Sequence, residues 1–244
     1  MIAAGHGWAL AAFPLLAAVI ALAFALRLSV RLADRWRWHE AVWAVALLMF
    51  AAASAAMFVG VLRGWHPADF RIYWLFGAVL NVPFLLAGEI YLLGRRRAIG
   101  HLFVAFLIAA SAFAGWKVFA ASVHQAPLSG RLPLGKDVFG DGSLPYRLAQ
   151  YYSLPAYFLL IAGLVWSVLQ MKGKPALRDR AAGTFGIALG ATIVAIGSGI
   201  GAAFHVVPLF SVSLAAGVAV MFWGFLRASR AVRIPHEELA GGQR

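Results

Sequence analysis

Residues 182–226 read AGTFGIALGATIVAIGSGIGAAF, then HVVP, then LFSVSLAAGVAVMFWGFL, and they contain no Asp, Glu, Lys or Arg. A helix needs about 20 apolar residues to cross a hydrocarbon core that is roughly 30 Å thick. The runs 182–204 and 209–226 both approach or exceed that length, and only the four residues 205–208 join them. This stretch therefore predicts two transmembrane helices that form a tight hairpin.

Five more apolar runs of similar length precede this hairpin. They are residues 8–26, 41–62, 72–93, 102–122 and 154–171. The 244-residue chain is 63% hydrophobic and only 12% charged, outside the range of soluble domains. No basic segment precedes the first run, so we interpret it as a retained helix rather than a cleaved signal. We predict an all-α, polytopic transmembrane bundle of about seven helices.

Positive charges mark one side of the predicted bundle. Of the 21 Lys and Arg residues, 15 fall at one set of helix ends and 5 at the opposite set. The larger set is Arg27, Arg31, Arg35, Arg37, Arg95, Arg96, Arg97, Lys172, Lys174, Arg178, Arg180, Arg227, Arg230, Arg233 and Arg244. Because loops rich in Lys and Arg stay in the cytoplasm, the N-terminus is predicted outside and the C-terminus in the cytoplasm.

The domain organisation follows from these spans. Residues 1–228 are predicted to form one seven-helix transmembrane domain, and residues 229–244 a short basic cytoplasmic tail near anionic lipid headgroups. The one long connection, residues 123–150, is expected on the outer side. It is rich in Gly and Pro and shows no obvious helix. A binding role and a mobile flap are both open for it.

Five glycines share one face of the sixth predicted helix. They are Gly183, Gly186, Gly190, Gly197 and Gly201. At about 100° per residue they lie within roughly 60° of one another. Bare backbone lets another helix approach closely, so the pattern predicts a helix-packing face. We expect it to serve a neighbouring helix, another membrane protein or a second copy, with a ligand lying on the backbone as the alternative.

The third predicted helix is the most polar of the spans. Asn81 and Glu89 lie about two turns apart, and Pro83 between them removes one backbone hydrogen bond. Intramembrane carboxylates are costly and often functional. Two interpretations of Glu89 are open. It faces the bundle as a proton- or ion-linked residue, or it pairs with the arginines at 95–97 or reaches cytoplasmic water.

Lys117 is the only basic residue inside a predicted span, and with Asn81 and Glu89 it completes the candidate intramembrane polar site. It lies just over a turn from the outer end of its helix, where a lysine reaches the headgroups. The alternative is a buried counter-charge. A retinal Schiff base is excluded in its usual place, because residues 209–226 contain no lysine.

Four of the seven histidines, His6, His66, His124 and His205, are expected on the outer side. Imidazole is the commonest metal ligand and titrates near neutral pH. The pattern is not specific, since it contains no HxxxH or HxxH motif, and the absence of cysteine excludes thiolate sites. These four residues form a candidate metal, haem or pH-sensing set, and the sequence identifies no cofactor.

One resemblance supports the layout. The run RIYWLFGAVLNVPFLLAGEIYLL at 71–93, the GKDVF at 135–139 and the glycine-rich sixth helix resemble a group of uncharacterised actinobacterial membrane proteins. The resemblance covers most of the chain. It implies a seven-helix protein of the bacterial cell membrane, and it brings no activity, ligand or catalytic residue.

Three functional hypotheses follow. The first is a non-enzymatic sensor or accessory subunit that packs against a partner through the sixth helix, because the spans carry few polar groups. The second is a small permease that uses Asn81, Pro83 and Glu89. The third is a haem- or metal-binding protein that uses the outer histidines. The lipid bilayer is the expected partner in each. Nucleic acid is not an expected partner, because the net charge of +12 lies in clusters between apolar runs.

Overall fold

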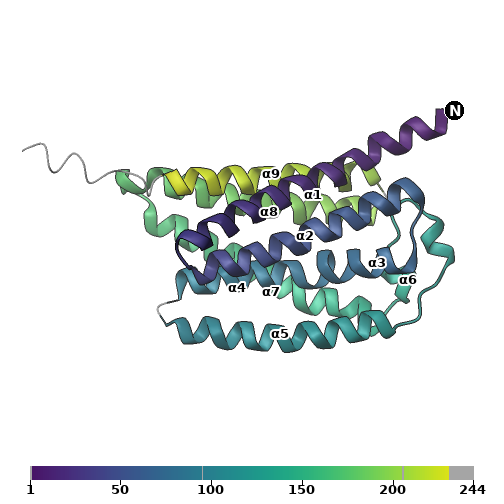
Figure 1. Cartoon of the computed structure of the whole chain (residues 1–244), viewed down its shortest axis with the longest axis horizontal. Helices are drawn as coiled ribbons and strands as arrows, with labels where there is room; N and C mark the ends of the chain where they lie inside the picture. The colour runs from purple at the N-terminus through teal and green to yellow at the C-terminus, as the bar shows by residue number, and fades with distance from the viewer. Residues whose placement is uncertain (1, 95, 205, 231–244) are drawn as a thin grey trace, which may run out of the picture.

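Seven long apolar helices make up most of the part of the chain that the computed structural model describes. It describes the backbone of residues 2–94, 96–204 and 206–230, and the side chains of residues 8, 10–94, 96–204 and 206–229. Each of the seven is long and apolar enough to cross a membrane. The predicted all-α bundle is confirmed, and the protein is a multi-pass integral membrane protein (Figure 1).

The spans keep the predicted order, and most of them extend beyond the predicted ends, although α5 and α8 end one or two residues before the predicted ends. They are α1 Ile2–Asp34, α2 Trp38–Arg63, a third span built from α3 Pro67–Tyr73, a π-helical segment Trp74–Leu80 and α4 Asn81–Leu93, then α5 Arg97–Ala120, α7 Leu144–Met171, α8 Arg178–Ala203 and α9 Val207–Arg230. Most helices are longer than their apolar runs because helical backbone continues into the headgroup layers, where charged side chains are tolerated.

The long connection is shorter and more ordered than predicted. It contains a 3₁₀ turn, Ala126–Ser129, and the short helix α6, Gly135–Phe139, and it ends where α7 begins at Leu144. Pro145 lies in the first turn of α7, where its missing N–H costs no hydrogen bond. Leu128, Leu132, Val138 and Phe139 are buried. The connection therefore packs onto the end of the bundle as a folded cap.

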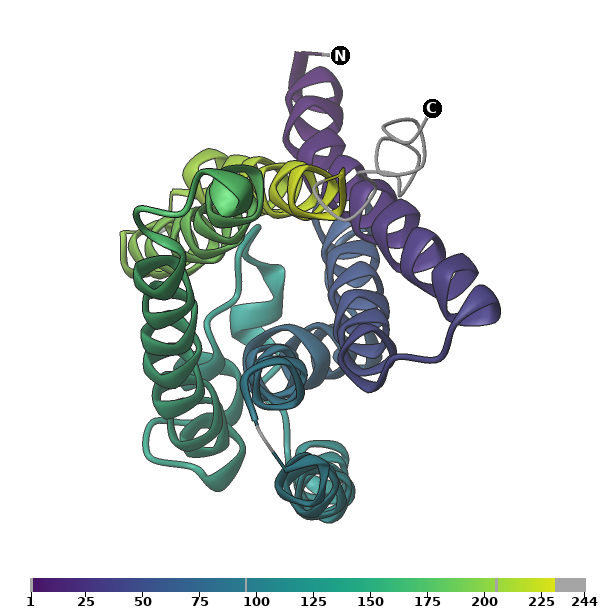
Figure 2. The same cartoon turned by 90° about the vertical axis from the view of Figure 1, so that its left-hand side faces the viewer.

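Six of the helices form a closed ring. Going round it, α1 contacts α2, α2 contacts α4, α4 contacts α7, α7 contacts α8, α8 contacts α9, and α9 contacts α1. Viewed along the helices, the ring surrounds a central axis and α5 stands outside it (Figure 2). In keeping with that place, α5 packs on α4 and α7 and is among the least buried spans.

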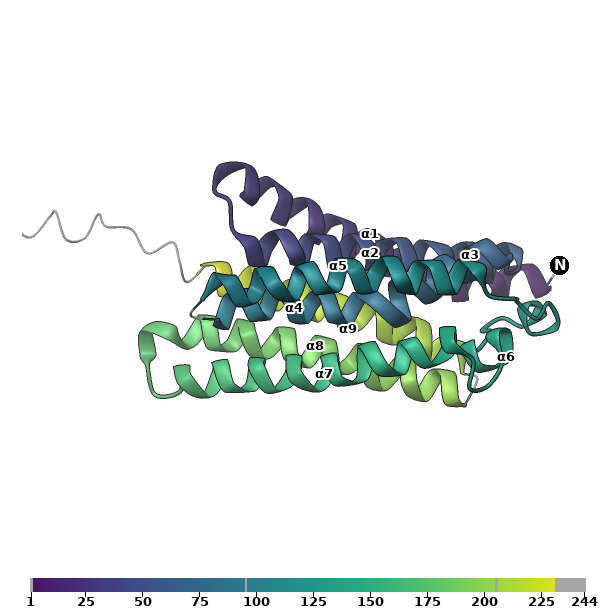
Figure 3. The ribbon, with the colours of Figure 1, turned by 90° about the horizontal axis from the view of Figure 1, so that it is seen from below.

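The two ends of the bundle differ in their connections. We call the end that carries the α1–α2, α4–α5 and α7–α8 connections the basic end, and the end that carries α6 the loop end. The basic end is on the left and the loop end on the right in Figures 1 and 3. The charge count predicts that the basic end faces the cytoplasm. Residues 231–244, most of the predicted basic tail, lie outside the described residues.

The third span is tied to its neighbours where its helix is irregular. A proline cannot donate to the carbonyl four residues before it, so Pro83 frees the carbonyl of Val79. The hydroxyl of Ser153 on α7 donates to the carbonyls of Ala78, at 2.6 Å, and Val79, at 3.3 Å. The Asn81 amide donates to the Ala46 carbonyl on α2, at 2.7 Å. These bonds hold the irregular segment between α2 and α7.

Candidate functional site

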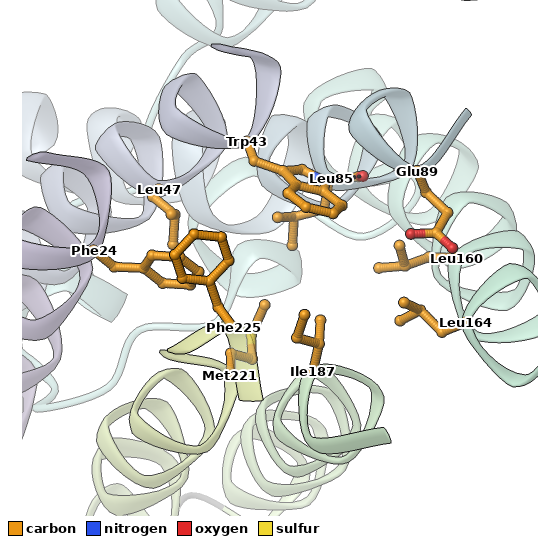
Figure 4. A pocket seen from close by; sticks show the side chains of 10 residues that line it. All are labelled: Phe24, Trp43, Leu47, Leu85, Glu89, Leu160, Leu164, Ile187, Met221 and Phe225. Atoms are coloured by element: carbon orange, nitrogen blue, oxygen red, sulfur yellow. Dashed lines mark hydrogen bonds between the residues drawn. The ribbon is translucent and has the colours of Figure 1, made fainter. Parts of the chain in front are cut away.

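A cavity lies inside the ring, and all six ring helices contribute to its wall. Nine of its ten lining side chains are apolar or aromatic, and the tenth is a carboxylate. They are Phe24 of α1, Trp43 and Leu47 of α2, Leu85 and Glu89 of α4, Leu160 and Leu164 of α7, Ile187 of α8, and Met221 and Phe225 of α9 (Figure 4). The cavity volume is about 20 Å³, which leaves room for about one water molecule.

Glu89 is the charged group of this cavity. Its side chain is 2% exposed, and neither carboxyl oxygen has a hydrogen-bond partner among the described residues. Figure 4 shows the carboxyl group beside Leu160 and Leu164. The absence of a side chain at Gly163 of α7 makes room for it, because an added Cβ there would lie 3.2 Å from Glu89 Cγ and 3.3 Å from Oε1. Glu89 therefore faces the interior of the bundle.

Of the arginines expected as partners of Glu89, the two that the structure describes do not reach it. Arg96 and Arg97 are exposed, and neither forms an ion pair with Glu89. Arg95 lies outside the described residues. Water at the basic end does not reach the carboxyl group either, since it is buried. Of the two interpretations of Glu89, the structure favours the one in which it faces the bundle.

Aromatic side chains form the wall opposite the carboxyl group. Figure 4 places Phe24 and Phe225 across the cavity from Glu89. Their rings lie 4.9 Å apart between centroids. Trp43 stands between them and Glu89, and its indole N–H donates to the Leu85 carbonyl at 3.0 Å. The sequence analysis did not single out these three residues, because apolar aromatic residues occur in every span.

The other two members of the candidate polar site lie elsewhere. The Asn81 amide is engaged with α2 and does not line the cavity. Lys117 lies on α5, outside the ring, with its ammonium nitrogen 4.1 Å from the centre of the Trp116 ring. That position matches a lysine reaching the headgroups and not a counter-charge for Glu89. The structure therefore leaves Glu89 as the candidate functional residue of the three.

The glycine face of the sixth span packs against α9. An added Cβ on Gly190 would lie 2.5 Å from the Gly217 carbonyl oxygen, and one on Gly201 would lie 2.7 Å from the Phe210 nitrogen. Gly183, Gly186 and Gly197 meet Gly224, Trp223 and Ser213 of α9 in the same way. Of the partners expected for this face, the structure shows the neighbouring helix, because α9 covers it. A ligand on the bare backbone is excluded for the same reason.

The histidines predicted on the outer side have structural partners where their side chains are described. His66 Nδ1 accepts a hydrogen bond from the Ala68 N–H at 3.3 Å and so caps α3. His124 Nδ1 lies 3.1 Å from the Val138 carbonyl oxygen and ties together two parts of the long connection at the loop end. The side chains of His6 and His205 lie outside the described residues. Within the described part of the chain, no three His, Asp or Glu side chains gather as a metal site.

One buried acid was missed by the sequence analysis. Glu40 in the first turn of α2 is 2% exposed, and its Oε1 lies 2.8 Å from Arg31 and 3.2 Å from Arg37. Arg31 also donates to the Ser229 hydroxyl on α9, at 2.7 Å. This network joins α1, α2 and α9 at the basic end. Its sequence signal was a glutamate placed among the arginines of the first connection.

No protein-family model, curated protein or solved structure matches the chain. The chemistry of the site therefore rests on its geometry. A single carboxyl group in an apolar cavity offers no nucleophile with a base beside it and no set of metal ligands. It can hold a proton or accept a cation, since an ionised carboxylate without a partner is costly in such surroundings.

Proposed function

We propose that this protein is a small proton-linked permease, with Glu89 as the residue that binds and releases the proton. The observation that carries the proposal is the position of Glu89 in a cavity whose wall is shared by all six ring helices. A group at such a point is separated from either end of the bundle only by side-chain packing between neighbouring helices. Small relative movements of the helices would give it access to one end or the other.

The third span supports the same proposal. Irregular helices inside membranes occur where the backbone lines a functional path or is rescued by neighbouring side chains. Here the π-helical segment and Pro83 precede Glu89 in one span, and the Ser153 hydroxyl donates to the Val79 carbonyl that Pro83 frees. A hydroxyl that bridges two carbonyls can follow a small shift of the helix without leaving a buried group unpaired. The irregular backbone thus lies in the same span as Glu89.

The sensor or accessory-subunit hypothesis rests on the small number of polar groups in the spans and stays a prediction. The partner surface that it assigned to the sixth span is covered by α9 in this structure. The haem or metal hypothesis gains none from His66 and His124, because each has a structural partner. The permease hypothesis keeps Glu89 as its functional residue, whereas Asn81 becomes a positioning residue that holds α4 against α2.

The proposal is tested in reconstituted vesicles with a pH-sensitive dye inside. A pH gradient is imposed, and a panel of small amines, carboxylic acids and sugars is added in turn. We expect one class of solute to collapse the gradient faster with wild-type protein than in protein-free vesicles, and Glu89→Gln to remove the difference. Asp141→Asn is the matched control, because Asp141 is an exposed acid of the outer connection. Equal rates in the Glu89→Gln and wild-type vesicles would overturn the proposal.

A further inference from the structure

A second hollow lies at the basic end, separate from the cavity in the ring. It is a groove of about 330 Å³ between the α1–α2 connection and the start of α5. Arg35, Arg37 and Arg97 supply its charge, and Trp36, Trp38 and Tyr91 supply most of its remaining wall. The groove combines guanidinium groups with indole and phenol rings, the side chains that suit the level of lipid headgroups.

The positive charge of the groove is largely unneutralised. Among the described residues, no ion pair involves Arg35 or Arg97, whereas Arg37 is partly engaged by Glu40. Asp34 is the one acid in the α1–α2 connection region besides Glu40, and its side chain is exposed. The groove therefore offers two guanidinium groups that have donors free for an anion.

Two helix starts reinforce this charge. The helices α2 and α5 begin next to the groove, after Arg37 and Arg96, and neither start has a side-chain cap. The first N–H groups of a helix lack acceptors within the helix, and they favour negative charge nearby. Guanidinium groups and free helix N–H groups together are the donors that bind phosphate oxygens.

The aromatic wall is held in place by contacts between helices. Trp38 of α2 stacks on Tyr91 of α4, with centroids 6.1 Å apart, and meets the His101 ring of α5 edge-on at 4.8 Å. The Tyr91 hydroxyl lies 2.8 Å from His101 Nδ1. These contacts join α2, α4 and α5, so the groove has a defined shape rather than being a chance gathering of surface arginines.

Exposed apolar side chains lie on α2 and α5 between the groove and the membrane interior. Seven residues are nearly two full helical turns, so Val45 lies on the same face of α2 as Trp38, and Ile108 on the same face of α5 as His101. Val45 is 40% exposed and Ile108 is 60% exposed. Both helices therefore carry an exposed apolar side chain about two turns from the groove, on the side of the membrane interior, where an acyl chain can contact it.

We propose that this groove binds an anionic phospholipid, with the headgroup phosphate on Arg35 and Arg97 and an acyl chain along α2 and α5. Charge, helix N–H groups, aromatic wall and exposed apolar side chains all match that one occupant. A soluble phosphate ester would use the charged groove and leave those apolar side chains uncovered. The proposal is independent of Glu89, which lies in the ring.

The test uses the purified full-length protein and follows its thermal unfolding in detergent. Added phosphatidylglycerol is compared with zwitterionic phosphatidylcholine and with inorganic phosphate, and native mass spectrometry counts the lipids retained. We expect phosphatidylglycerol to raise the unfolding temperature and to be retained, and Arg35→Gln with Arg97→Gln to weaken its binding roughly 30-fold, at about tenfold per 1.4 kcal/mol and about 1 kcal/mol per arginine.

A matched control variant distinguishes lipid binding in this groove from a general effect of positive charge at the basic end. Lys172→Gln with Lys174→Gln removes two exposed charges from the α7–α8 connection at the same end, away from the groove. It should bind phosphatidylglycerol as the wild type does. Equal losses in the two double variants, no loss in either, or the same stabilisation by inorganic phosphate alone would each overturn the proposal.

Discussion

Two glutamates in this protein are buried to the same extent and have opposite surroundings. Glu40 and Glu89 are both 2% exposed. The carboxylate of Glu40 lies against Arg31 and Arg37, so its charge is matched at the basic end of the bundle. Glu89 has no described partner and lies in an apolar cavity. An acid that is paired stabilises the fold, whereas an unpaired acid is retained at a cost and indicates function.

The structural role of Glu40 predicts a clear loss of stability. Glu40→Gln should lower the free energy of unfolding by about 1–3 kcal/mol, because two arginines lose a buried charge partner. Asp179→Asn is the control, since the pair Arg227–Asp179 is exposed on both sides, and its loss should change the stability by less than about 0.5 kcal/mol. Thermal unfolding in detergent measures both. Equal effects of the two substitutions would show that Glu40 does not hold the helices together.

At the scale of elements, the hairpin of α8 and α9 shows what a glycine pattern predicts and what it leaves open. The spacing of five glycines on α8 predicted a close approach by another helix. It could not say which helix, because bare backbone has no chemistry that selects a partner. The other half of the interface lies on α9, where Gly217 and Gly224 meet the backbone of Gly190 and Gly183. The short connection between the two spans makes α9 the nearest candidate.

This interface predicts a position-specific effect of adding one methyl group. Gly190→Ala should lower the free energy of unfolding by about 1–3 kcal/mol, because the new Cβ would meet the Gly217 carbonyl oxygen and Met221. Gly199→Ala on the same helix should be neutral or stabilise by up to about 1 kcal/mol, because nothing lies within 4 Å of its Cβ position. Thermal unfolding of the two variants measures both changes in stability. A neutral Gly190→Ala would contradict the close packing of α8 on α9.

At the scale of the whole molecule, the sequence predicted the number and order of the spans, because an apolar run of sufficient length forms a helix that crosses the membrane. The ring could not be predicted. Its order of neighbours depends on how individual side chains interlock, and apolar helices resemble one another at that level. The cavity could not be predicted either, because it depends on the same arrangement of helices. Glu89 itself was identified, because a lone carboxylate in an apolar span is visible in the sequence alone.

The helical turns of the connection between α5 and α7 could not be predicted, for a local reason. Its glycines and prolines obscured any helical pattern, yet Gly140 and Gly142 take positive φ angles of 91° and 72°, which turn the chain from α6 toward α7. Val138 and Phe139, the apolar residues directly before this turn, are buried on the bundle. Such a compact cap depends on contacts with the helices beneath it, which the sequence of the connection does not contain.

The proton on Glu89 is the central claim, and infrared difference spectroscopy of the protein in lipid tests it most directly. Spectra recorded between acidic and alkaline pH should contain one band from a buried protonated carboxyl group that loses its proton. That band should be absent from Glu89→Gln and unchanged in Asp141→Asn. Identical difference spectra from wild type and Glu89→Gln would contradict the claim that the ring encloses a proton-binding carboxyl group.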